Sequence, residues 1–260
     1  MKQSRKIVDG RRDKLLHLLE LYGTLKVDFL ARELETSPLT IRRDLEALDE
    51  QGLIDRFYGG ASLRSEYAGN VFNSTLILHK HAIARAAASL VEDGDTVFLN
   101  ISSTALLILQ YITARQVTVI TNNAKAVFCR YGGNVNVVLT GGELRSPKEA
   151  MVGDFALNNL ARVTASKCFI GCAGLTEEEI MTAVLQEAAI NTAMLERTIG
   201  AKYVVADHTK IGRRQSFLTG EVSQFTGLIT DTETQRYYVD SFRQRGLEVI
   251  QVPPLKKLDR

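Results

Sequence analysis

The chain has 260 residues, a formal net charge of +2 and 45% apolar residues. This length suits one large domain or two smaller ones, and the apolar content can supply real cores. The weak net charge gives no compositional argument for nucleic-acid binding, so such an argument must rest on where the charges lie. Three cysteines at irregular spacing exclude a disulfide framework and a cysteine zinc site.

Targeting and membrane signals are weak. The basic N-terminus is not followed by an apolar segment, and no run approaches the roughly 20 apolar residues that cross a bilayer. We therefore expect a cytoplasmic protein with reduced thiols.

The first 35 residues predict two helices. Leu15, Leu16, Leu19 and Tyr22 recur at helical spacing before Gly23, and a second short helix lies around Asp28. The turn over 35–37 leads directly into a third helical stretch. This order is that of a helix-turn-helix.

The stretch from Thr36 to Gly52 carries its own start and stop signals. Ser37 is a good N-cap, Pro38 suits the first helical position, and Gly52 can end the helix. Ile41, Leu45 and Leu48 share one face at 100° per residue. The opposite side presents small, hydroxyl and guanidinium groups, namely Leu39, Thr40, Arg43 and Ala47, with Arg42 on the flank.

Such a face fits base edges, and a flanking arginine fits a phosphate, so the pattern predicts a DNA recognition helix. The alternative is an ordinary surface helix with a solvated charged face. The next segment favours DNA binding, because two extended runs flank Gly59 and Gly60 as in a β-hairpin wing. Arg56 and Arg64 lie on this hairpin. A basic N-terminal patch is predicted from Lys2, Arg5, Lys6, Arg11, Arg12 and Lys14.

The remainder of the chain predicts an α/β domain. Residues 65–78 have no sustained period and are interpreted as a linker, and an alanine-rich helix follows over 79–90. Short apolar runs then alternate with helical stretches, which indicates a Rossmann-like, mostly parallel sheet covered by helices on both faces. The runs are Thr96–Ile101, Val117–Thr121, Val135–Leu139, Cys168–Gly171, Tyr203–Ala206, Leu228–Thr230 and Val249–Val252.

Ligands of such sheets bind beyond the carboxyl ends of the strands. The residues at these ends are hydroxyl, amide, glycine and charged types, which suits a phosphorylated polyol, with Lys210 supplying positive charge. For the first loop, helix capping alone is the alternative. The predicted effector contacts are Ser102, Ser103, Thr104, Thr121, Asn122, Gly141, Gly142, Glu143, Asp207 and Lys210.

Other signals point to no further chemistry. His79 and His81 could suggest a metal, but no carboxylate or thiol cluster stands beside them in the sequence, so a solvated helix start is favoured. Neither Gly-x-Gly-x-x-Gly nor a P-loop occurs, which disfavours dinucleotide oxidoreductases and nucleotide hydrolases. We expect no metal, no cofactor and no catalytic residues.

The N-terminal segment resembles the DeoR family of bacterial transcription regulators. The resemblance is carried by the block Thr40-Ile41-Arg42-Arg43-Asp44-Leu45, by Gln51-Gly52-Leu53 and by Tyr58-Gly59-Gly60-Ala61. In that family the first block lies on the recognition helix, and a histidine is common where this chain has Tyr58. The expected DNA contacts are Ser37, Leu39, Thr40, Arg42, Arg43, Ala47, Arg56, Tyr58, Gly59 and Gly60.

The resemblance extends to about Asp231. It implies a sensor domain similar to sugar-phosphate isomerases such as ribose-5-phosphate isomerase, which binds a phosphorylated sugar that alters DNA affinity. The usual Asp-Ala-Gly-Thr-Thr is replaced here by Asn100-Ile101-Ser102-Ser103-Thr104, so the loop lacks a carboxylate and a glycine. A glycine and a proline expected near Glu179 and Ala183 are also absent.

These expectations combine into a winged helix-turn-helix over 7–64, a linker over 65–78 and a sensor domain over 79–252. The predicted function is a repressor of a sugar metabolism or transport operon that acts as a homodimer or higher oligomer. Two alternatives stay open. One is a sugar-phosphate isomerase with an appended DNA-binding module, against which Asn100 speaks because it replaces a carboxylate. The other is a constitutive DNA-binding protein with a degenerate sensor.

Overall fold

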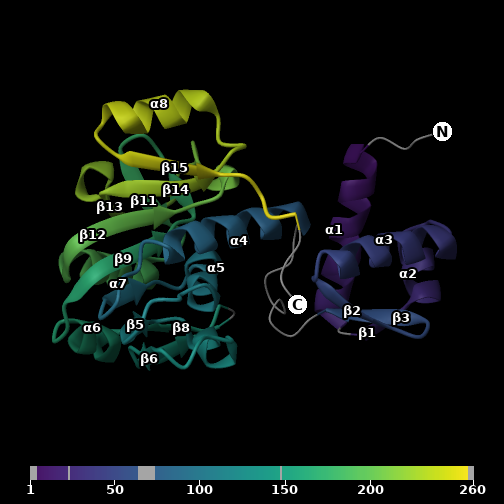
Figure 1. Cartoon of the computed structure of the whole chain (residues 1–260), viewed down its shortest axis with the longest axis horizontal. Coiled ribbons are helices and arrows are strands. Elements are labelled where there is room, and N and C mark those ends of the chain that lie inside the picture. The colour runs from purple at the N-terminus through teal and green to yellow at the C-terminus, as the bar shows by residue number, and fades with distance from the viewer. Residues whose placement is uncertain (1–4, 23, 64–73, 147, 257–260) are drawn as a thin grey trace. The chain divides into compact units, whose positions relative to one another are not determined.

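The computed structural model describes residues 5–22, 24–63, 74–146 and 148–256 (Figure 1). The chain divides into two compact units, residues 1–79 with 254–260 and residues 80–253. Helix α4 (Ser74–Ala88) begins inside the stretch predicted as a linker. The rest of that stretch, like Arg64, lies outside the described residues.

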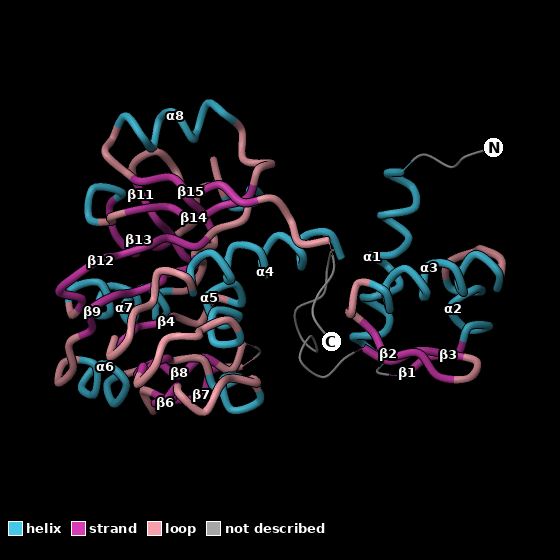
Figure 2. The backbone as a smooth tube through the Cα atoms, in the orientation of Figure 1, coloured by secondary structure: helices cyan, strands magenta, loops and turns pink. Residues whose placement is uncertain are grey.

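The first unit is a winged helix-turn-helix. Its helices are α1 (Arg5–Tyr22), α2 (Val27–Glu33) and α3 (Pro38–Glu50). Strands β1 (Thr24–Lys26), β2 (Ile54–Phe57) and β3 (Gly60–Leu63) form a sheet in the order β1-β3-β2 (Figure 2). Helix α1 starts earlier than predicted, because charged residues with good helix propensity precede its apolar stripe. Strand β1 was not predicted, since three residues carry no periodic signal.

The predicted features of α3 are confirmed. Ile41, Leu45 and Leu48 are all buried in the core of this unit. The Ser37 hydroxyl accepts a hydrogen bond from the backbone N–H of Thr40 at 3.2 Å, which caps the helix as expected. Gly52 has φ of 76°, the left-handed conformation that a glycine adopts without strain where a helix ends.

A buried ion pair ties α3 to α1. The carboxylate of Asp44, with 3% of its side chain exposed, accepts from Arg11 Nε at 2.6 Å and from Arg12 Nε at 3.1 Å. Asp44 therefore serves the fold rather than the DNA. The same contacts direct Arg11 and Arg12 into the protein, so neither acts as a free member of the predicted N-terminal basic patch.

The second unit is built on a parallel sheet of seven strands in the order β15-β14-β12-β9-β4-β5-β6. Each predicted apolar run forms one of these strands, so the predicted α/β fold is confirmed. In chain order they are β4 (Thr96–Leu99), β5 (Val117–Thr121), β6 (Val135–Leu139), β9 (Ala165–Gly171), β12 (Thr198–Val205), β14 (Gly227–Asp231) and β15 (Glu248–Val252).

Helices cover both faces of this sheet. Along β4, Val97 and Leu99 pack in one cluster with α4 and α5 (Ser103–Leu107), whereas Phe98 packs in the other. Alternation of side chains along a strand produces these two layers. The cluster that contains Phe98 includes side chains from α6 (Asp154–Leu160), α7 (Leu185–Glu196) and α8 (Arg236–Gln244).

Two small sheets of the second unit were not predicted. Strands β7 (Glu143–Arg145) and β8 (Ala150–Val152) form a hairpin. Strands β10 (Gly174–Leu175), β11 (Glu179–Thr182) and β13 (Phe217–Glu221) form an antiparallel sheet. These strands are short and form because of tertiary contacts, so their local sequences do not predict them.

The Asp44 ion pair yields a stability prediction. Replacing Asp44 by Ala leaves two guanidinium groups without their carboxylate, and we expect the helix-turn-helix to lose on the order of 2 kcal/mol, a figure reduced because the arginines are partly exposed. Hydrogen exchange of α3 amides in the full chain measures this loss. Glu46→Ala, at an exposed position of the same helix, is the control. Equal protection in both variants would contradict the structural role.

Candidate functional site

The first candidate site is the outer face of α3. Arg42 and Arg43 are exposed, as are Ser37 and Leu39, and the last has 56% of its surface accessible. Thr40 and Ala47 are half-buried. The helix thus presents guanidinium, hydroxyl and small apolar groups from one capped, packed scaffold, which is the chemistry that reads base edges and phosphates.

The hairpin between β2 and β3 extends this set. Arg56 and Tyr58 are exposed, and Gly59 turns the chain with φ of 83°. Gly60 differs from the other predicted contacts because it is buried. A Cβ at position 60 would lie 2.4 Å from the carbonyl oxygen of Leu25, so a glycine is required there for packing of β3 against β1.

The second candidate site lies at the carboxyl ends of β4, β9 and β12, three neighbouring strands of the sheet. Lys80 on α4 donates from Nζ to the hydroxyl of Ser103 at 3.3 Å. Burial lowers the pKa of Lys80, the Asp207 carboxylate acts in the opposite direction, and the charge of Lys210 lowers it further. These groups are therefore close enough to interact electrostatically.

Lys80 and Lys210 are two positively charged groups near the Ser103 hydroxyl that an anion could contact, with the Asp207 carboxylate beside them. Nearby, burial raises the pKa of the Cys172 thiol to about 12, so it stays protonated near neutral pH. The arrangement suits binding of an anion and does not present an activated thiol nucleophile.

The hydroxyl of Ser102 is occupied by helix capping. Its oxygen accepts from the backbone N–H groups of Thr104 and Ala105 at 3.2 and 3.4 Å. The side chain also packs on Gly171, where a Cβ would lie 1.9 Å from the Ser102 hydroxyl oxygen. The capping alternative therefore accounts for Ser102, and Ser103 is the hydroxyl that faces Lys80.

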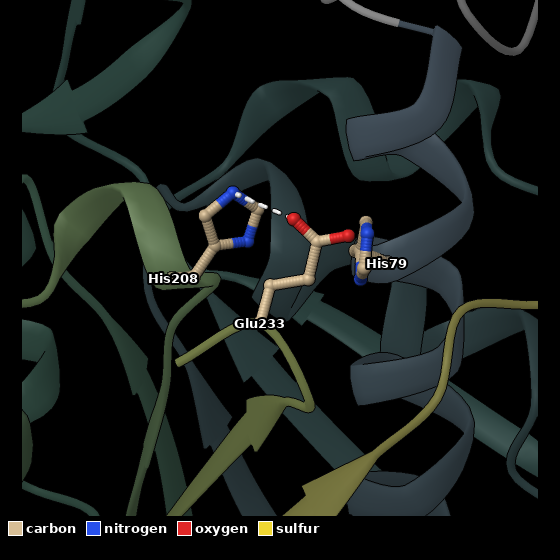
Figure 3. A group of neighbouring side chains, drawn as sticks. All are labelled: His79, His208 and Glu233. Carbon is tan, nitrogen blue, oxygen red and sulfur yellow. Dashed lines mark ion pairs between the residues drawn. The ribbon is translucent and has the colours of Figure 1, made fainter. Parts of the chain in front are cut away.

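The loop after β12 is held by one carboxylate of its own and by two from the end of β14 and the loop after it. Asp207, buried, accepts from the backbone N–H of Thr209 at 3.0 Å. The next residue, His208, places Nδ1 2.9 Å from the Asp231 carboxylate and Nε2 3.8 Å from Glu233, the pair joined in Figure 3. These contacts fix the turn that carries Lys210.

Two side-chain amides form hydrogen bonds at the end of β5. Asn123 donates to the carbonyl of Ile101 at 3.2 Å, which ties this strand end to the loop after β4. Asn122 donates to the carbonyl of Met151 at 3.2 Å, and its Oδ1 is buried with no hydrogen-bond donor among the described residues. Thr121 is buried and its carbonyl accepts from the Thr140 N–H.

The structure separates Gly141, Gly142 and Glu143 from Lys210. They follow β6, which is four places from β12 in the sheet, or about 19 Å at the usual spacing of about 4.8 Å. Gly142, with φ of 108°, packs on the carbonyl of Val152, so it shapes the turn into the hairpin. The hairpin that follows these residues nevertheless reaches α7, where Lys148 and Arg145 contact Glu187.

Several residues at this site were not among the predicted contacts. Glu187 is buried at the start of α7, where it accepts from Lys148 Nζ at 3.2 Å and from the Thr182 hydroxyl at 3.0 Å, with Arg145 at 3.8 Å. Lys80 was not predicted because the His-Lys-His pattern around it indicated only a possible metal site or a solvated helix start. A single lysine in an alanine-rich helix was the available signal.

The interpretation of His79 and His81 as a solvated helix start is wrong. Both are 1% exposed. His81 Nδ1 lies 2.6 Å from the Tyr111 hydroxyl, and burial lowers the His81 pKa to about 4, so this ring is neutral at physiological pH.

Comparison with known proteins identifies both parts of the chain. Residues 11–66 match the DeoR-like helix-turn-helix domain, and residues 77–232 match the DeoR C terminal sensor domain. The chain is 31% identical over 233 residues to the lactose phosphotransferase system repressor of Staphylococcus aureus, covering 86% of this chain and 92% of the relative. It is 33% identical to the HTH-type transcriptional regulator GolR of Listeria innocua, covering 92% and 96%.

Solved structures share only remote similarity. A D-ribose-5-phosphate isomerase in complex with phospho-erythronic acid covers 53% of this chain and 54% of its own, with TM-score 0.39 and 12% identity. Translation initiation factor eIF-2B of Pyrococcus horikoshii covers 87% and 89%, with TM-score 0.42 and 13% identity. Neither supports a functional argument. In the described part of the chain, every helix is too short or too polar to cross a membrane.

The exposed arginines of α3 yield a DNA-binding prediction. If Arg43 contacts a base, Arg43→Ala should cost about 1–3 kcal/mol on the best DNA site and relax base preference at one position. Arg42→Ala should instead weaken binding to all sequences and reduce the salt dependence, because a phosphate contact carries no sequence information. Selection from a random DNA library followed by titration separates the two effects. Unchanged affinity and selectivity in Arg43→Ala would reject its assignment.

Proposed function

Because the chain belongs to the DeoR family of transcription regulators, we propose that it represses a sugar transport or metabolism operon and that a phosphorylated sugar releases it from DNA. Support for repression comes from its relatives, which are named as a lactose phosphotransferase system repressor and a transcriptional regulator. The exposed face of α3 and the wing supply the groups that would contact operator DNA.

The observation that carries the effector proposal is the partly buried contact between Lys80 and Ser103 within electrostatic range of Lys210 and Asp207. A phosphate placed here would accept from the Ser103 hydroxyl and both ammonium groups. It would also relieve the repulsion between the two lysines. The phosphate would therefore form charge-assisted hydrogen bonds that are stronger than those that water forms with the same groups.

Sugar hydroxyls would meet groups that surround this phosphate position. The Asp207 carboxylate and the orphan Oδ1 of Asn122 are hydrogen-bond acceptors, and Lys148 is a partly exposed donor next to the buried Glu187. Strands β4 and β12 are two places apart, or about 10 Å. This span suits one small phosphorylated sugar across the ends of β4, β9 and β12.

Release from DNA follows from linkage. A ligand lowers DNA affinity only if it binds the DNA-free form more tightly than the DNA-bound form, and the two affinities change by the same factor. One short recognition helix makes few base contacts, so we propose a homodimer or higher oligomer that reads paired half-sites.

The isomerase alternative receives no support from the groups at the strand ends. Position 100 carries an amide, and the Glu187 carboxylate is engaged by Lys148 and Thr182. The relatives are named as regulators rather than enzymes. We therefore propose a regulatory role for the sensor unit.

Lys210 provides the test. Lys210→Ala should retain wild-type DNA affinity but need at least about ten-fold more sugar phosphate for release, because one charge-assisted contact of about 1.5–3 kcal/mol is lost. A mobility-shift titration over a panel of phosphorylated sugars measures this. Lys202→Ala, within β12 rather than in the loop that follows it, is the control. An unchanged response would remove Lys210 from the site, and no thermal shift of the wild type with any panel member would favour a constitutive DNA-binding protein.

A further inference from the structure

Asn100 clamps the backbone of the neighbouring strand. Its Nδ2 donates to the carbonyl of Gly171 at 2.8 Å, and its Oδ1 accepts from the Gly171 N–H at 3.0 Å. The same Oδ1 accepts from the N–H of Ser102 at 3.3 Å. Because a backbone carbonyl can only accept and a backbone N–H can only donate, these partners fix which end of the side-chain amide is nitrogen.

The second hydrogen on Nδ2 continues the network. It reaches Oδ1 of Asn191 on α7 at 3.1 Å, and Asn191 in turn donates to the hydroxyl of Thr219 on β13 at 3.3 Å. Thr192 donates to the Thr219 carbonyl at 3.0 Å. Asn100, Asn191 and Thr219 are all buried, so each of these bonds lies in a region where an unmade bond is costly.

The network returns to the loop that carries Lys210. Strand β13 pairs with β11, which pairs with β10. Leu175 of β10 accepts from the N–H of Gly212 at 2.8 Å, two residues after Lys210. A continuous set of hydrogen bonds and strand pairs therefore joins the Ser102 loop after β4 to the Lys210 loop after β12.

We propose that Asn100, Asn191 and Thr219 form a positioning network that holds Ser103 and Lys210 at the spacing the effector needs. This inference rests on the proposed effector site. It assigns a role to the amide at position 100, where the family resemblance leads one to expect a carboxylate. The network sets how well the anion site is formed before the ligand arrives, so its loss weakens effector binding without changing any group that touches the effector.

A carboxylate cannot replace this amide. In Asn100→Asp, an ionised oxygen would face the Gly171 carbonyl and lose both donated bonds, whereas a protonated carboxyl restores one. The folded-state pKa of that Asp is therefore raised above its unfolded value of about 3.9. The folded Asn100→Asp variant then loses stability as the pH rises above the unfolded-state pKa of this Asp. Its free energy of unfolding therefore falls further below that of wild type between about pH 5 and about pH 8.

The experiment compares four full-length proteins: wild type, Asn100→Asp, Thr219→Val and the control Thr230→Val. Thr230 shares a buried hydroxyl pair with Thr234 and is not part of the network. The ligand-free readouts are hydrogen exchange of residues 100–106 and thermal unfolding from pH 5 to pH 8. The ligand readouts are thermal shifts with inorganic phosphate and with D-ribose 5-phosphate, and DNA affinity is measured beside them.

We expect Thr219→Val to raise exchange at residues 100–106 by about two- to ten-fold, which corresponds to one hydrogen bond. Asn100→Asp should show a larger increase, the pH-dependent stability gap, and partial recovery of protection at pH 5. Both variants should keep DNA affinity within about two-fold. The control should match wild type in exchange at residues 100–106 and in pH dependence, although losing the Thr230–Thr234 pair lowers its overall stability. Exchange in Thr219→Val equal to the control, or a pH-independent gap in Asn100→Asp, would overturn the network.

The ligand arm separates this inference from the proposed function. If wild type binds neither phosphate probe but the ligand-free readouts behave as described, the anchoring role of the network stands and the effector site is rejected. If wild type binds a probe and Asn100→Asp binds it equally well at pH 8, the positioning role is rejected.

Discussion

The parallel sheet of the second unit is the constraint on which its chemistry depends. All strands point the same way, so every loop that follows a strand emerges at one edge, and side chains far apart in sequence become neighbours. Ser103 and Lys210 are brought to the same edge in this way although 107 residues separate them, and Lys80 on α4 lies close enough to contact Ser103. The lateral order of the strands then decides which loops can share one ligand, because each step across the sheet adds about 4.8 Å.

The difference between the existence of the strands and their lateral order explains which features could be predicted from the sequence. Apolar runs and capping signals predicted all the central strands, the recognition helix and its N-cap at Ser37. The order β12-β9-β4-β5-β6 could not be read from them, since pairing of parallel strands depends on tertiary packing. Gly141 and Lys210 therefore looked equivalent in sequence, whereas in the fold they follow strands that are four places apart.

The residues that sequence reasoning missed share a physical cause. Lys80 lies on a helix before the sheet begins, and Glu187 and Asn191 lie one turn apart on α7, where the small β10-β11-β13 sheet packs nearby. Their roles come from burial and from partners contributed by distant segments. Periodicity reports which face of a helix is apolar, but it does not report which polar group that face brings toward a strand end.

The departures from the family pattern at positions 100 and 102 belong to one local arrangement. The amide of Asn100 needs Gly171 for two of its bonds, and the side chain of Ser102 needs the absence of a Cβ on that same glycine. Ser102 then caps α5 while Asn100 accepts from its N–H. A loop that had decayed would leave buried polar groups without partners. Here the polar groups of Asn100 and Ser102 all have hydrogen-bond partners. This argues that the loop is maintained in a modified form rather than degenerate.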